Sequence, residues 1–342
     1  MIWVTWRQFR AQGITAAAFI AAFGLVLLIS GLDVAHVYSD TGLGTCHGAN
    51  CVTAARAFLD QLKGTPNDVV FYGGICVMYL APALMGMFWG APLVARELEA
   101  GTFRLAWNQS VGRSRWLVVK LGLIGLAAMA TAGLLSLFTG WWASPIYTAA
   151  AAAGPNSFSL VRISPTQFGA LGIVPVAYSA FGFALGVTAG VLLRRTIPAM
   201  AVALAGFAFI QLAWASWIRA HLIAPLRESF AITPNVIDGI ETTNGNKMFV
   251  TAAVNKPGAW IISNQTVDAA GHPFTGPPTH ACQGGSLQAC NASIGALHLR
   301  SLVSYQPASR FWELQWTEAA IFLALAVLLG WFCTWWVRRR MT

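Results

Sequence analysis

Residues 167–193 read QFGALGIVPVAYSAFGFALGVTAGVLL and contain neither a charged side chain nor a histidine. About 20 apolar residues in a helix cross the hydrocarbon core of a bilayer, and this segment exceeds that length. It follows Ser164-Pro165-Thr166, in which serine suits the N-cap and proline the first position of a helix. The segment therefore predicts a membrane-spanning helix over 167–193.

The rest of the chain repeats this pattern. Hydrophobic residues make up 56% of the sequence and charged residues 10%, and the mean hydropathy is +0.60. Soluble domains are about one quarter charged, so a soluble nucleic-acid binder, a coiled coil and a disordered chain are excluded. The windows lack the alternation that barrel strands require. The sequence predicts an all-α membrane protein with six transmembrane helices, the other five over 14–32, 70–95, 117–143, 197–218 and 317–337.

Basic residues concentrate in the shorter connections. With Lys120, one turn inside the third helix, one side of the membrane receives twelve of the 21 basic residues, on segments 1–13, 96–116, 194–196 and 338–342. Short cytoplasmic loops carry the excess of Lys and Arg, so both termini are expected to be cytoplasmic in a multi-pass protein of the plasma membrane. The net charge of +9 thus indicates topology rather than a nucleic-acid partner.

The opposite side holds segments 33–69, 144–166 and 219–316. The last one is long enough to fold by itself. Its apolar runs at 248–254 and 260–262 are separated by turn residues such as Lys256-Pro257-Gly258, which is typical of short strands. We expect a small extracytoplasmic insertion with some β structure, and helix again over 309–316. The expected domains are 1–13, 14–218, 219–316 and 317–342.

Cysteine usage indicates an oxidising outer face. Cys46 and Cys51 share the first outer segment, and Cys282 and Cys290 share the large one. Two disulfides are expected, although three connectivities are possible among four cysteines. A metal site using His280, Cys282 and Cys290 is the alternative, but its spacing is wider than that of most zinc sites. Cys76 and Cys333 lie within predicted helices and are expected to be inert.

The predicted spans carry few groups with chemistry. None has an ionisable side chain near its middle, which argues against an ion-driven carrier and an intramembrane hydrolase. Gln211 is the most polar mid-span residue, and an interhelical hydrogen bond is its expected role. Gly182, Gly186 and Gly190 recur every four residues, a stripe that lets helices approach closely within or between subunits.

Energy for transport would have to come from another chain. Each of the four lysines is followed by Gly, Leu, Met or Pro, so the sequence contains no phosphate-binding loop ending in Lys-Ser or Lys-Thr. The cytoplasmic segments are also too short to form a nucleotide-binding domain. We expect no catalytic residue, no cofactor and no metal in this chain, with ATP and Mg²⁺ on a partner ATPase.

The loop after the second predicted span is the most specific segment. It begins Arg96-Glu97-Leu98-Glu99-Ala100-Gly101-Thr102-Phe103-Arg104-Leu105-Ala106-Trp107. Gly101 is expected to end one helix and Thr102 to cap a short new one. In that helix Phe103 and Trp107 would share a face able to fill a partner's groove.

This loop resembles one in the permease subunits of type-2 ABC (ATP-binding-cassette) exporters. The shared features are Glu-x-Gly-Thr after span two, a short helix, Arg113-Ser114-Arg115 and a lysine entering span three. The amphipathic, basic stretch 3–10 is similar to the interfacial elbow helix of that family. The stretches 305–307 and 311–315, with Glu318, resemble an actinobacterial branch. Apart from these stretches the resemblance covers the membrane part, because segment 219–316 is longer than the outer connection usual in that family.

The resemblance implies a cytoplasmic coupling helix that docks into an ATPase subunit. Its expected contact residues are Arg96, Glu97, Glu99, Gly101, Thr102, Phe103, Arg104 and Trp107. It also implies a second permease copy or a paralogue in the bilayer, and export of a drug, lipid or other hydrophobic molecule. The alternatives are a membrane-anchored sensor whose unit 219–316 binds a ligand and, behind it, a polytopic enzyme using outer histidines.

Overall fold

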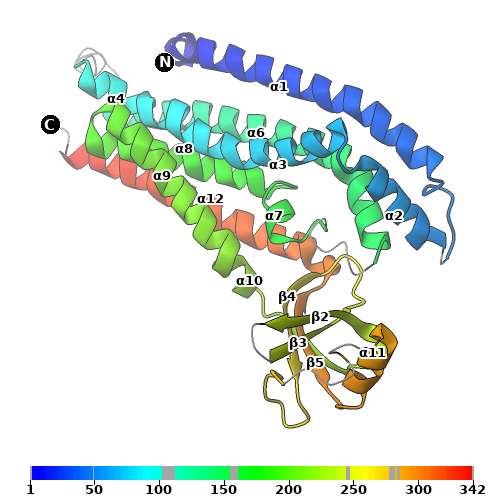
Figure 1. The fold of residues 1–342 in the computed structure, drawn as a ribbon. Coiled ribbons are helices and arrows are strands. Elements are labelled where there is room, and N and C mark those ends of the chain that lie inside the picture. Colours follow the sequence, from blue (N-terminus) through cyan, green and yellow to red (C-terminus); the bar gives the residue numbers. More distant parts are fainter. Residues whose placement is uncertain are drawn as a thin grey trace.

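The structure of the protein is a computed structural model and describes residues 2–48, 50–101, 112–154, 161–243, 247–276, 282 and 286–340. It is a long helical bundle with a small sheet unit at one end (Figure 1). Both chain termini lie at the other end. We call these the sheet end and the terminal end. This arrangement fits an even number of membrane crossings between the termini.

Within the described residues, six helical stretches are long and apolar enough to cross a membrane. Span one belongs to α1 (Ile2–Asp40) and span three to α6 (Arg113–Ala152). Span two joins α3 (Pro66–Met85), the π-helical turn η1 (Gly86–Gly90) and α4 (Ala91–Glu99). Span four is α8 (Val174–Leu193). Span five joins α9 (Thr196–Ala213), the π-helical turn η3 (Trp214–Ile218) and α10 (Arg219–His221), and span six is α12 (Phe311–Arg340).

Two predicted boundaries differ from the structure. The fourth window is not one helix: α7 (Pro165–Phe168) is followed by non-helical backbone, and α8 starts only at Val174. Gly172, with a φ of 68°, and the nearby prolines interrupt the helix there. Residues 2–13 are helical, but they continue into span one without a break, even though residue 13 is a glycine.

Span four is the centre of the bundle and packs directly against span two. An added Cβ would lie 2.6 Å from the Pro82 oxygen at Gly182, 2.0 Å from the Gly86 oxygen at Gly186 and 2.5 Å from the Ala91 oxygen at Gly190. The glycine stripe therefore faces backbone within the same chain. Only hydrogen at these positions permits such an approach, and η1 lies at the contact.

The sheet unit between spans five and six is antiparallel throughout its named strands. β1 (Leu226–Ala231), β5 (Arg300–Gln306) and β4 (Trp260–Val267) form one sheet in the order β1-β5-β4. β2 (Ile237–Thr243) pairs with β3 (Lys247–Ala252) in a second. The unit also holds η4 (Pro234–Val236) and α11 (Leu287–Gly295). The short strands predicted around 248–254 and 260–262 are present, and η6 (Ala308–Arg310) leads into α12.

The first connection at the sheet end is also structured. α2 (Asn50–Leu62) packs Phe58, Leu59 and Leu62 into the same core as Tyr147 and Trp142 of α6. The Nε atom of Arg56 donates to the carbonyl oxygen of Ala153 at 2.9 Å. This helix was not predicted, because its sequence is too short and too polar to resemble a span.

Candidate functional site

Residues that flank segment 102–111 join three spans to one another. We call Glu97, Glu99, Lys120 and Thr196 the base of the 102–111 loop. Lys120 of α6 donates to the Glu97 carboxylate at 2.5 Å, and both side chains are largely buried. Lys120 also lies over the Trp116 ring, 4.6 Å from its centroid. Glu97 belongs to span two and Lys120 to span three, so a charge pair joins these spans at the terminal end.

Span five joins the same base through Glu99. Its carboxylate oxygen accepts the backbone N–H of Thr196 at 3.0 Å and the Thr196 hydroxyl at 2.8 Å. A carboxylate in this place satisfies a donor that every helix N-terminus leaves open, so Glu99 caps α9 from another helix. α4 ends at Glu99, and Gly101 follows with a φ of 71°, as expected of a residue that ends a helix.

Part of the predicted site lies outside the described residues, namely Thr102, Phe103, Arg104 and Trp107. Arg96 is exposed beside the base. The described residues show Glu97 with Lys120 and Glu99 with Thr196, since helices distant in sequence meet here.

A buried charge cluster lies near the sheet end of spans four, five and six. Arg219 and Glu318 are both 0% exposed. Arg219 donates to the two Glu318 oxygens, from Nε and Nη2, at 2.9 Å each. Nη2 also donates to the Tyr178 hydroxyl at 2.8 Å, and the Tyr178 hydroxyl in turn donates to Glu318. A bidentate arrangement of this kind fixes the relative position of three helices.

The same cluster holds the segment between α7 and α8. Nη1 of Arg219 donates to the Pro165 carbonyl at 2.9 Å, and its guanidinium lies over the Phe168 ring. Gln315 of α12 accepts the N–H groups of Ile173 and Val174 at 3.0 and 3.1 Å. Its amide nitrogen donates to the carbonyls of residues 168 and 171. Non-helical backbone is thereby satisfied inside the protein, as a membrane requires.

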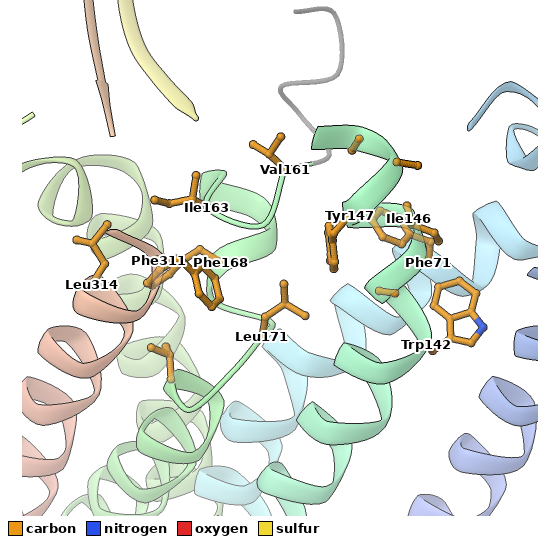
Figure 2. Packing of buried hydrophobic residues seen from close by; sticks show 14 of the residues in the cluster. Phe71, Trp142, Ile146, Tyr147, Val161, Ile163, Phe168, Leu171, Phe311 and Leu314 are labelled. Carbon is orange, nitrogen blue, oxygen red and sulfur yellow. The ribbon is translucent and has the colours of Figure 1, made fainter. Parts of the chain in front are cut away.

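Sequence reasoning missed this cluster. The sequence analysis assigned Arg219 to an outer segment and Glu318 to the edge of the last span, so it did not predict that the two side chains pair. The available signal was one acid and one base at the same end of adjacent spans. Figure 2 shows the neighbouring packing, in which Phe168 and Phe311 meet below Ile163, with Leu314 to their left.

Gln211 of α9 does not make the interhelical hydrogen bond expected of it. Its side chain is 8% exposed, and both its oxygen and its nitrogen lack a partner in the part of the chain that the structure describes. Gln211 is one of the residues that line a groove of about 630 Å³ between α3 and α9, together with Tyr79, Leu80, Phe207 and Leu212, while its amide atoms are themselves buried. The lining is almost wholly apolar, which suits a hydrophobic ligand.

The cysteines lie in the expected pairs. The structure bonds Cys46 to Cys51 and Cys282 to Cys290. Oxidation of all four in the mature protein stays a prediction. Cys333 is buried against the Thr188 hydroxyl, whereas Cys76 is exposed on the bundle surface.

Comparison with known proteins places this bundle in a family. Residues 17–219, more than half of the chain, match the family model described as ABC-2 membrane transporter related. The match covers spans one to five and ends at Arg219, before the sheet unit and span six. No curated protein and no solved structure matched the chain. Because the family model covers most of the membrane bundle, the chain belongs to the ABC-2 membrane transporter-related family.

Proposed function

We propose that this chain is the permease subunit of an ATP-driven exporter in the plasma membrane. A separate ATPase subunit holds ATP and Mg²⁺, and a second permease copy or a paralogue completes the transporter. The observation that carries the proposal is the base of the 102–111 loop, where Glu97 and Glu99 join span two to spans three and five.

This base is built to pass on a force. An ATPase that binds the loop pushes or pulls on α4 and α6 at their ends. The buried Glu97–Lys120 pair and the Glu99 cap make spans two, three and five respond together, as one rigid body. A loop attached only by its two chain connections would move without displacing α9.

The cavity beside Gln211 is the place where we propose that cargo binds. It lies between spans two and five, which the base joins at the terminal end, so the cavity moves with these spans as part of one rigid body. Its almost wholly apolar lining favours a hydrophobic molecule.

The docking part of the proposal is tested with Phe103→Ala combined with Trp107→Ala. Buried aromatic anchors often cost about 2 kcal/mol each when truncated, roughly a thirtyfold loss of affinity. We expect the variant to insert and fold but to lose an ATPase that co-purifies with the wild type. Phe209→Ala combined with Trp331→Ala is the matched control, because both rings are exposed along the spans. Undiminished ATPase retention and transport by the loop variant would contradict the coupling assignment.

The orientation is tested by impermeant thiol labelling in intact cells. Gly112→Cys at the terminal end and Asn255→Cys in the sheet unit are suitable because both positions are exposed. Gly112 has a φ of −60° and open space around an added Cβ, so a cysteine fits there without strain. Cys76 is replaced by alanine in both. We expect labelling at residue 255 and none at residue 112. The reverse result would invert the proposed topology.

A further inference from the structure

A second groove lies at the sheet end, away from the Gln211 cavity. It has a volume of about 690 Å³ and lies between α6, the segment leading from residue 162 to α8, and the start of α12. Figure 2 shows Tyr147 of α6 and Leu171 of that segment on its two sides. Neither the charge cluster nor the loop base contributes to it.

One cation, Arg162, lines this groove without an acidic partner among the described residues. The Arg162 side chain is exposed and lines the groove, with its guanidinium 4.4 Å from the centroid of the Phe311 ring. Among the described residues, none of the ion pairs includes Arg162. The ring holds the guanidinium in place while leaving its N–H donors open, and these donors match a phosphate group.

The groove is graded in polarity along α6. Ser136, Leu137 and Gly140 line it nearer the middle of the helix, where the Ser136 hydroxyl is used by its hydrogen bond to the Gly172 carbonyl at 2.7 Å, whereas Ser144 and Thr148 line it nearer the end at Ala152. Thr148 donates its hydroxyl to the Ser144 carbonyl, so the Ser144 hydroxyl is the free donor of the two in the described part of the chain. The groove thus has an apolar inner part and a polar, cationic outer part.

Two tryptophan side chains indicate where the groove lies across the bilayer. Trp141 is 59% and Trp312 51% exposed, and both line it. Tryptophan is enriched where hydrocarbon meets headgroups. The groove therefore lies where a lipid changes from acyl chain to headgroup.

An apolar groove of similar volume adjoins the groove that Arg162 lines. This apolar groove runs between α1 and α6, is lined almost entirely by carbon, and shares Trp141 with the Arg162 groove. Its lining on α1 extends from Ala17 to Leu28, a helical rise of about 16 Å. That is roughly half of a hydrocarbon core about 30 Å thick, a length that one acyl chain can cover.

We propose that these two grooves bind one phospholipid of the leaflet at the sheet end. Its phosphate is bound by the Arg162 guanidinium with the Ser144 hydroxyl as a second donor, and an acyl chain lies between α1 and α6. The wholly apolar groove favours a lipid over free phosphate, because a soluble anion would leave it empty. The site is independent of the proposed transport function.

The experiment is native mass spectrometry of the purified full chain with two lipids of identical acyl chains. One is phosphatidylglycerol, and the other is monogalactosyl diacylglycerol, which lacks phosphate. We expect the wild type to retain phosphatidylglycerol in preference. Arg162→Gln is expected to lower that retention about tenfold, the loss of a charged hydrogen-bonded contact, and Arg162→Lys to lower it less. Arg227→Gln, which removes an exposed arginine of β1, is the control and leaves retention unchanged.

Three results would overturn the proposal. One is equal retention of phosphatidylglycerol by the wild type and Arg162→Gln. Another is equal retention of both lipids by the wild type, which would show a site that does not recognise phosphate. The third is displacement of the lipid by millimolar glycerol 3-phosphate, which would show a site for a soluble phosphate. Because Arg162 is exposed, thermal unfolding of the variant is expected to match the wild type and so exclude misfolding.

Discussion

Glu318→Gln is expected to destabilise the bundle strongly while changing almost no volume. The Arg219 guanidinium is fully buried, and Glu318 supplies the only carboxylate that it contacts in the described residues. Removing one partner of a buried ion pair leaves an uncompensated charge and typically costs about 3–5 kcal/mol. Its remaining partners, the Tyr178 hydroxyl and the Pro165 carbonyl, cannot neutralise it. With about 2–4 °C lost per kcal/mol, we expect the unfolding temperature to fall by about 10 °C.

Thermal unfolding is followed with a thiol-reactive fluorophore in a background with Cys76→Ala, so that buried Cys333 reports the loss of structure. The decisive comparison is the double variant Arg219→Leu with Glu318→Leu, which removes both charges. We expect it to be more stable than Glu318→Gln alone, because no charge is left buried. Arg219→Leu and Glu318→Leu are also measured singly. If the stability lost by the double variant equals the sum of these two single losses, the side chains act independently and the reasoning is refuted.

Three further predictions concern packing, pH and oxidation. Gly186→Ala should cost at least about 1–3 kcal/mol in thermal unfolding because its Cβ would overlap the Gly86 carbonyl, whereas Gly206→Ala, which meets only a leucine methyl at 3.5 Å, should be tolerated. Hydrogen bonds from the Lys256 ammonium and the Tyr305 hydroxyl keep the pKa of the Glu228 carboxyl below its usual range. That stabilisation is complete above the unfolded pKa of about 4.3 and is lost as pH falls through the lower folded pKa. The unfolding temperature of Glu228→Gln should therefore fall less between pH 7 and 3 than that of the wild type. Unreduced digests analysed by mass spectrometry should contain both predicted cystine peptides, and free thiols at all four positions would contradict them.

The sequence alone predicted the six helical stretches that, in the described part of the chain, are long and apolar enough to cross a membrane. Uninterrupted apolar length is a local property, and no tertiary contact can make a charged segment cross a lipid core. The same holds for the strands of the sheet unit, where turn residues separate short apolar runs. The helix end at Gly101 was also predictable, since a positive φ there suits glycine.

Where local preferences conflicted, the prediction was less accurate. The window at 167–193 is apolar throughout, yet Pro165, Gly172 and Pro175 divide it. Hydropathy records which residues avoid water and not whether their backbone is helical. The tertiary structure shows how the freed backbone groups are satisfied, by Gln315 of α12 and by the Ser136 hydroxyl of α6, which donates to the Gly172 carbonyl.

Tertiary structure alone decided which polar side chains meet. Arg219 and Glu318 are separated by the whole sheet unit, and Glu97 and Lys120 by the 102–111 loop. A polar residue near a span end is compatible with snorkelling into water, and nothing local distinguishes that from pairing with another helix. The cost of burying a charge is avoided only when helix packing brings its partner within hydrogen-bond distance.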